Sequence, residues 1–302
     1  MPLRFAMIVV AHLVGILVGG ACFAQVDGGG PGKIAFHLEI LDPDGVRTAL
    51  APGKTSKKSD VFAFDRAYLP GDQMVFSDSR GGSQQVAAKV DVAEPECLLY
   101  LKGPAKFEIP YGREEKQTGS AYAPEVFAGT AHQVALRQMS KAEILSYRNL
   151  ALNPCDTLVT DTVFPHASTN SYSRNLFDFA ARNAIDGITQ NGHHGVWPFQ
   201  SWGPGLRTDL WWQVDFGRPV EVDKIRMMVR ADFPHDSYWK SARVEFSDGS
   251  EEDIQLVAVP GFQDFRFKKR KVAWLRLTNL VPADETRWCS LIEVEAWGRD
   301  LN

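Results

Sequence analysis

Hydrophobic and polar residues alternate along most of the chain, in short runs separated by turn-forming residues. Residues 33–41 place four apolar side chains on one face of an expected strand, and the turn signal Asp42-Pro43-Asp44-Gly45 follows. Similar extended runs are expected at 61–64, 73–77, 84–92, 97–101, 106–109 and 133–138. Short strands separated by clusters of Gly, Pro, Asp and Ser predict a β-sandwich or a jelly roll.

The second half of the chain continues the alternation in further runs. Strands are expected at 212–216, 222–229, 242–246, 253–259, 265–267, 272–277 and 292–296, and Asp248-Gly249 is expected to form a hairpin turn. All eight tryptophans lie in this half. The asymmetry indicates two different domains, so the expected fold class is all-β with two β-sandwich domains.

A short helix is expected between the two halves. Ser140-Lys141-Ala142-Glu143 has the form of a capping box, and Asn153-Pro154 ends the helical pattern. The expected organisation is therefore an N-terminal β-sandwich over 25–139, a helical linker over 140–152 and a second domain over 153–302. The polar segment 111–129 interrupts the first domain, and a loop of that length is either functional or mobile.

The first residues have the layout of a secretory signal peptide. Arg4 precedes an apolar run over 5–20, and small residues follow up to Ala24, after which cleavage is expected. The run is shorter than the ~20 residues of a membrane-spanning helix. We therefore expect an exported protein that is periplasmic, secreted or at the cell surface, without a stable membrane span. A lipoprotein attached through Cys22 is the alternative.

Charge and cysteine content narrow the function classes. The net charge is -4, and the one prominent basic run is 268–271, so a nucleic-acid partner is not expected. Removal of residues 1–24 leaves Cys97, Cys155 and Cys289, which cannot all pair within one chain. A Cys155–Cys289 bridge and two buried thiols at these positions both remain open.

Two motifs carry a family resemblance. They are Asn183-Ala184-Ile185-Asp186-Gly187 and, after a loop with two histidines, Trp211-Trp212-Gln213-Val214-Asp215-Phe216-Gly217. In this order they resemble the discoidin or coagulation factor 5/8 type C family, over about residues 153–298. Its sugar-binding branches include the fucolectins and the galactose-binding carbohydrate modules of family-32 type. The resemblance implies a jelly-roll sandwich with the galactose-binding-like fold.

The resemblance also implies a structural Ca²⁺ ion. Its oxygen ligands would be the carboxylates of Asp186 and Glu293 and the backbone carbonyls of Asn183 and Ile188, since Ca²⁺ prefers six to eight oxygens. The alternative is purely structural: Asp186 caps a turn, and Glu293 is a surface residue of the last strand.

A sugar site is expected on the loops of this domain. Fucolectins carry Arg-x-Asp on the strand after the Trp-Trp motif and a histidine in the preceding loop, which correspond here to Arg230, Asp232, His193 and His194. The basic residue that follows in fucolectins is absent from His235-Asp236-Ser237, so the resemblance does not extend to fucose specificity. Loop tryptophans, expected to be exposed, would stack on sugar rings. The expected carbohydrate-binding set is Arg230, Asp232, His193, His194, His235, Asp236, Trp197, Trp202 and Trp239.

These features predict an exported, non-catalytic protein that binds a polysaccharide or glycoconjugate. One alternative is a glycan-active enzyme, a lyase or hydrolase, that uses the histidine and aspartate loops. The sequence has no HExxH, no GxSxG and no evident carboxylate pair for glycoside hydrolysis. The other alternative is a protein- or lipid-adhesion module, for which Trp197 and Trp202 are the candidate apolar contacts.

Overall fold

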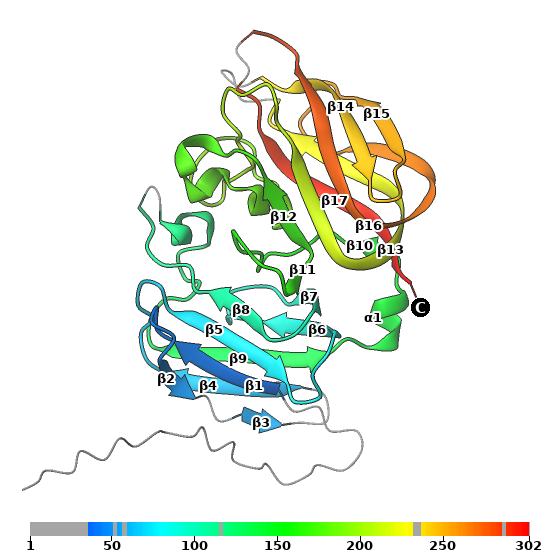
Figure 1. Cartoon of the computed structure of the whole chain (residues 1–302). Coiled ribbons are helices and arrows are strands. Elements are labelled where there is room, and N and C mark those ends of the chain that lie inside the picture. Colours follow the sequence, from blue (N-terminus) through cyan, green and yellow to red (C-terminus); the bar gives the residue numbers. More distant parts are fainter. Residues whose placement is uncertain are drawn as a thin grey trace, which may run out of the picture. The chain divides into compact units, whose positions relative to one another are not determined.

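The computed structural model describes residues 36–50, 53–55, 59–114, 117–231, 237–285 and 288–301. Every described residue belongs to one compact unit, which spans 34–302 (Figure 1). The expected signal peptide lies outside the described residues, as do the site candidates Asp232, His235 and Asp236.

The first sandwich contains an antiparallel sheet in the order β2-β1-β5-β8. In β1, Phe36, Leu38 and Ile40 are buried, so the alternation expected from the sequence is present. The turn between β1 and β2 is closed by Asp42, whose side chain accepts hydrogen bonds from the amides of Asp44 and Val46. The strands are β1 (Phe36–Leu41), β2 (Arg47–Leu50), β5 (Gln73–Asp78) and β8 (Ala105–Glu108).

The facing sheet has the order β11-β7-β6-β9-β4-β3. The last of its strands in the sequence, β11, follows the helical linker and pairs with β7 through Val163 and Phe164. The chain after residue 153 therefore contributes an edge strand to the first sandwich. The strands are β3 (Gly53–Thr55), β4 (Asp60–Asp65), β6 (Gln84–Lys89), β7 (Cys97–Leu101), β9 (Ala131–Gln138) and β11 (Val163–Phe164).

The capping box at Ser140 is confirmed. The Ser140 hydroxyl accepts a hydrogen bond from the Glu143 amide, and the Glu143 carboxylate accepts one from the Ser140 amide. The helix α1 (Lys141–Leu145) is only five residues long. It ends before the expected position because Arg148 and Asn149 form β10 (Arg148–Asn149), which pairs with the last strand of the chain.

The second sandwich is built around two long strands. They are β13 (Trp212–Val229) and β16 (Gln263–Pro282), and each has register shifts where the strand bends. The first part of β13 pairs with β12 and its second part pairs with β17, all within one seven-stranded sheet. The remaining elements are β12 (His166–Thr169), β14 (Trp239–Phe246), β15 (Glu251–Gln255) and β17 (Leu291–Asp300), with short helices η1 (Thr118–Ala121), η2 (Ser173–Asn175), η3 (Phe177–Phe179) and η4 (Ala181–Ala184).

Three tryptophans form the centre of the second core. Trp212 is fully buried, as its alternation with Val214 and Phe216 predicts. The expectation that Trp202 and Trp239 are exposed is wrong: both are buried, and their rings stack with centroids 5.4 Å apart. Trp202 is drawn inward because its amide and carbonyl pair with Leu291 of β17, while Trp239 is the first residue of β14.

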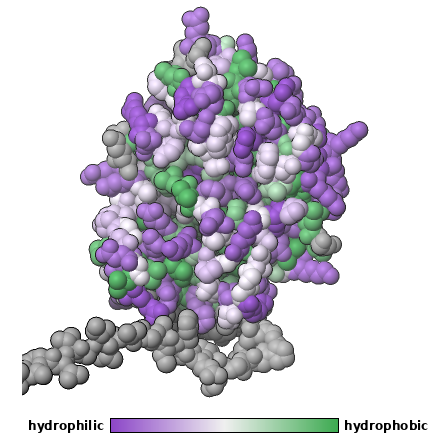
Figure 2. All heavy atoms as spheres, viewed as in Figure 1, coloured by the Kyte–Doolittle hydropathy of each residue, from purple (hydrophilic) through white to green (hydrophobic). Residues whose placement is uncertain are grey.

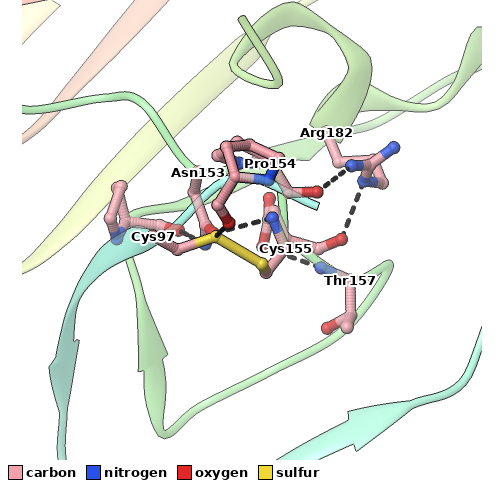
Figure 3. The surroundings of a disulfide bond; sticks show 9 residues. Cys97, Asn153, Pro154, Cys155, Thr157 and Arg182 are labelled. Carbon is pink, nitrogen blue, oxygen red and sulfur yellow. Dashed lines mark hydrogen bonds between the residues drawn. A yellow bond between two sulfur atoms is a disulfide. The ribbon is translucent and has the colours of Figure 1, made fainter. Parts of the chain in front are cut away.

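A disulfide fastens the segment between β10 and β11 to the core of the first sandwich. Cys97 at the start of β7 is bonded to Cys155, which lies between α1 and β12 (Figure 3). Both pairing schemes that the sequence left open are therefore wrong, because Cys155 is bonded to Cys97. Cys289 is buried and takes no part in this disulfide. The sequence did not show this pairing because it depends on the approach of β7 to a segment 58 residues away.

Candidate functional site

A pocket of about 510 Å³ lies among the loops of the second sandwich, within the size range of ligand sites. It draws residues from three segments that are far apart in the sequence: η2 and η3, the loop that precedes β13, and the residues just before β17. The lining residues are Ser173, Arg174, Leu176, Asp178, Phe179, His194, Gly195, Val196, Gly203, Gly205, Trp288, Cys289 and Ser290.

The segment that carries Arg174 has an unusual backbone. Arg174 and Asn175 both have φ of +54°, a left-handed conformation that residues other than glycine seldom adopt. The Ser173 amide donates to the Gly203 carbonyl at 2.7 Å, which ties this turn to the opposite loop. A Cβ on Gly203 would lie 2.8 Å from the Phe179 ring, so this close approach requires glycine. Strained backbone of this kind is frequent at binding sites.

Asp178 connects the pocket wall to the first sandwich. Its side chain is buried, and its carboxylate accepts a hydrogen bond from the Ser120 hydroxyl of η1. The Ser120 carbonyl in turn accepts from the Trp197 amide at 2.7 Å. The loop around Trp197 is therefore anchored on η1, inside the long polar segment 111–129. In the described part of that segment, Ser120, Ala121, Tyr122, Val126 and Phe127 are buried.

The two adjacent histidines, His193 and His194, lie in the loop that precedes β13. His194 lines the pocket, and its ring lies 5.3 Å from the ring of the exposed His193. The His193 ring is 5.6 Å from that of Phe199. Trp197 is half-buried and does not belong to the pocket lining. The loop thus brings one of its four predicted site residues, His194, to the pocket.

Arg230 lies beneath this loop. Its side chain is fully buried, and Nη2 donates to the Phe199 carbonyl at 3.0 Å. Its amide donates to the carbonyl of Ser290, a pocket residue. In this arrangement Arg230 holds two of the three segments that form the pocket, the histidine loop and the residues before β17. Direct contact between Arg230 and a sugar stays a prediction, and the buried Trp202 and Trp239 have no ring face open to a ligand.

Several lining residues were missed by the sequence analysis. Trp288 is 46% exposed and offers the pocket an indole ring. Arg174 is exposed, and Asp178 is buried beside it in the same wall. A tryptophan immediately before the last strand, in a polar context, was the available signal for Trp288. No periodicity signals Arg174 or Asp178, because their placement depends on the left-handed turn.

Asp186 and Glu293 come together around Gly187, and both side chains are buried. The Asp186 carboxylate accepts hydrogen bonds from the Ile188 amide and from Gln200 Nε2, both at 2.8 Å. The Glu293 carboxylate accepts one from the Gly187 amide at 3.2 Å. The nearby Asn183 is also buried, and its side chain donates to the Phe177 carbonyl at 2.8 Å.

The electrostatics of this carboxylate pair are unfavourable for two negative charges. Burial raises the pKa of Asp186 to about 6, against the opposing effect of the Arg182 cation. Burial, followed by the charge of Asp186, raises the pKa of Glu293 well above its usual value. Glu293 Oε1 and Gln200 Oε1 are buried without a hydrogen-bond partner among the described residues. No group of three or more His, Cys, Asp or Glu side chains within the described ranges is arranged to hold a metal.

Arg182 is a buried cation whose charge opposes the rise in the pKa of both carboxylates. It donates to the carbonyl of Pro154 (Figure 3), to that of Asp156 and to the side chain of Asn183. Its guanidinium also lies 4.6 Å from the ring centroid of Tyr122 in the first sandwich. Arg182 therefore ties the 183–187 turn to the disulfide segment and to η1.

Comparison with known proteins decides the family of the second sandwich. Residues 166–294 match the family model described as the F5/8 type C domain. The C-terminal domain belongs to the F5/8 type C, or discoidin, family. The resemblance noted in the sequence is confirmed, as is the all-β fold. No curated protein matches the chain at a significant level.

Solved structures similar to this chain cover about half of it. A chitosan-binding module from a chitosanase/glucanase of Paenibacillus sp. IK-5 is 21% identical, with a TM-score of 0.36, and covers 50% of this chain and 98% of its own. A fucose binding module of Streptococcus pneumoniae is 17% identical, with a TM-score of 0.35, over 51% and 96%. The lectin domain of Lectinolysin, complexed with Lewis B antigen, is 22% identical, with a TM-score of 0.34, over 51% and 97%.

Three observations concern contact with a membrane: the helices, the surface hydropathy and the exposure of the candidate tryptophans. No helix among the described residues is long and apolar enough to cross a bilayer. On the face drawn in Figure 2, hydrophilic side chains predominate, and hydrophobic ones form small separate patches. Among the candidate apolar contacts of an adhesion module, Trp202 is buried and Trp197 is half-buried.

Proposed function

We propose that the discoidin domain binds carbohydrate in the pocket formed by residues 173–179, 194–205 and 288–290. The observation that carries this proposal is the composition of the pocket, which combines His194, Arg174 and the indole ring of Trp288. Sugars present hydroxyl groups for planar hydrogen-bond donors and apolar C–H faces for aromatic rings. A concave site with an aromatic surface and a few fixed polar groups suits such ligands.

Each lining residue has a role in this proposal. Trp288 stacks against a sugar ring, and His194 and Arg174 donate hydrogen bonds to its hydroxyls. Asp178 holds the wall in place through Ser120, and Arg230 positions the loop that carries His194. The protein acts by binding rather than by catalysis.

We also propose that Asp186 and Glu293 share a structural Ca²⁺ ion. The residues fit this ion because Glu293 Oε1 and Gln200 Oε1 are buried oxygens that lack hydrogen-bond partners among the described residues. The carbonyls of Asn183 and Ile188 complete the oxygen donors that the family implies. The ion supplies positive charge that offsets the repulsion between the two carboxylates. Asp186 lies in the same loop as Gln200, so the ion braces the base of the pocket loop.

The proposed location is outside the cytoplasm. The signal-peptide pattern over 1–24 supports export. The Cys97–Cys155 disulfide supports an oxidising compartment, because such bonds are uncommon in the cytosol.

A glycan-binding screen tests the proposed pocket. The full chain is titrated with soluble polysaccharides and glycans, and released sugar is assayed in the same samples. Trp288→Ala is expected to weaken binding by at least about tenfold, the usual cost of losing one stacked ring. Trp211→Ala is the matched control, because Trp211 is half-buried and lies outside the pocket lining. Equal affinity of Trp288→Ala and the unmodified protein would refute the pocket, and release of sugar would favour the enzyme alternative.

A further inference from the structure

A second pocket, of about 280 Å³, lies in the first sandwich. It is formed by residues of 110–113 and 119–129 together with Ala67 and Tyr68, and it shares no lining residue with the discoidin pocket. Its walls are rich in aromatic rings: Tyr68, Tyr111, Tyr122 and Phe127. A polar segment as long as 111–129 is expected to be either functional or mobile.

The loop that borders this pocket is closed at its base by two glycines. A Cβ on Gly119 would lie 1.9 Å from the Gly112 carbonyl oxygen, so no larger residue fits there. The Gly119 amide donates to the Tyr111 carbonyl at 3.2 Å. The Tyr111 amide donates to the Thr118 hydroxyl at 2.9 Å. These contacts fix both ends of the loop that carries Arg113.

Phe127 lines the same pocket in a strained conformation. Its φ is +57°, in the left-handed region, which is a genuine exception for a bulky residue. The Phe127 amide donates to the buried Asp91 carboxylate at 3.2 Å, which holds the backbone in this state. Strain that the surroundings maintain is typical of binding sites.

Tyr68 lines this aromatic pocket and carries a buried polar atom. The residue is 5% exposed, and its hydroxyl has no hydrogen-bond partner within the described part of the chain. Its ring lies 4.1 Å from that of His132, which holds it in position. Burial, followed by the charge of Asp91, raises the pKa of Tyr68, so the hydroxyl stays protonated and remains a donor.

Arg113 supplies the charge. It is the one charged side chain among the described residues that line the pocket. Nη1 donates to the Tyr122 carbonyl at 2.7 Å, which fixes the guanidinium beside the pocket while the side chain stays accessible. A guanidinium is suited to bind a carboxylate through paired N–H groups.

We propose that this pocket binds a sugar acid, a single uronate residue at the end of or within an acidic glycan. The aromatic walls accept the C–H faces of the sugar ring, the Tyr68 hydroxyl donates to a ring oxygen, and Arg113 binds the carboxylate. A neutral sugar leaves Arg113 without an anion. An aromatic carboxylate fills the walls but leaves the Tyr68 hydroxyl without an acceptor.

The test uses the full chain and small soluble probes. D-Galacturonate and D-glucuronate are titrated by ligand-observed NMR, with D-galactose, D-glucose and benzoate as comparisons. We expect saturable binding of at least one uronate, about tenfold tighter than its neutral counterpart, as one charged hydrogen-bonded contact provides. Equal binding of acid and neutral sugar, tighter binding of benzoate, or no saturation with either uronate overturns the proposal.

Variants assign the binding to this pocket. Tyr68→Phe removes only the hydroxyl and is expected to weaken uronate binding about tenfold without lowering the melting temperature. Arg113→Gln is expected to remove the preference for the acid. His194→Ala alters the discoidin pocket alone and is expected to leave uronate binding intact. Loss of uronate binding in His194→Ala, with full binding in Tyr68→Phe, assigns the ligand to the discoidin pocket and refutes the proposal while leaving the proposed function standing.

Discussion

The two sandwiches bury their charged side chains in different settings. In the first, the Asp60 carboxylate accepts from the Phe36 amide at 2.8 Å, and the Asp72 carboxylate accepts from the Leu69 amide and from Arg66, also at 2.8 Å. These carboxylates fasten strands and turns. In the discoidin domain, Asp186 and Glu293 lie beside each other with raised pKa values, and Arg182 and Arg230 are fully buried beneath loops.

The difference shows where the chain uses burial to organise a site. Hydrogen-bonded carboxylates stabilise the first sandwich locally, within one or two strands. The buried charges of the second connect segments that are distant in sequence: the disulfide segment, the 183–187 turn, the histidine loop and the residues before β17. Those are the segments that form the pocket and the proposed Ca²⁺ site.

The largest effect on the unfolding free energy is expected from substitution of Arg182. Arg182→Met removes three hydrogen-bond donors and leaves buried acceptors and the Asp186 carboxylate without their cation. Removing one member of a buried charged network costs about 3–5 kcal/mol of unfolding free energy. Arg243→Met is the surface control, since Arg243 pairs with exposed Asp253, and exposed pairs contribute about 0–1 kcal/mol. Denaturant unfolding compares the two variants, and similar losses would show that the buried Arg182 network stabilises the protein no more than an exposed ion pair does.

Much of the fold was predictable because strand alternation is a local property. Cys97–Leu101 forms a strand as expected, and β4, β5 and β9 lie within two residues of the expected runs. The capping box at Ser140 and the two motifs of the discoidin domain are equally local. In each case a few neighbouring residues contain the whole signal.

The site was predictable only in part because its residues meet through tertiary contacts. His194 was expected at a binding site and lines the pocket, but Trp288 comes from a segment more than 80 residues further along. Trp202 was expected on the surface because its neighbours are glycine and proline; its pairing with Leu291 instead draws it into the core. The Cys97–Cys155 bond likewise depends on the approach of two distant segments.

An intermediate effect is expected from calcium. At about 100 times its dissociation constant, bound Ca²⁺ raises the unfolding free energy by about 2.7 kcal/mol, and a chelator removes this gain. Asp186→Asn is expected to abolish the response, and to leave the calcium-free protein as stable as before or more stable, because it relieves repulsion with Glu293. Asp72→Asn in the first sandwich is expected to destabilise the protein equally with and without calcium. A calcium response that survives in Asp186→Asn would exclude the Asp186–Glu293 site.

The smallest effect contrasts one histidine in each sandwich. For His166, burial opposes the charge, but the Asp156 carboxylate 2.8 Å from Nδ1 outweighs it and raises the pKa. Its contribution to stability is therefore full below the unfolded pKa of about 6.5 and is lost as the pH rises through the folded pKa. For His132, burial lowers the pKa and outweighs Asp91, whose carboxylate is 4.0 Å away. Its contribution is full above about 6.5 and is lost as the pH falls through the folded pKa.

The two histidines should therefore give opposite pH dependences. Relative to the unmodified protein, His166→Gln is expected to lose more stability at pH 5.5 than at pH 8, because the charged pair with Asp156 is then fully formed in the unmodified protein. The comparable His132→Gln variant removes a group that resists protonation, so its deficit should shrink at pH 5.5. Denaturant unfolding of both variants at pH 5.5 and pH 8 measures this dependence. The loss of unfolding free energy in each variant is expected to change by about 1 kcal/mol between the two pH values. A change of the same sign in both variants would mean that burial, rather than the distance to the aspartate, controls both rings.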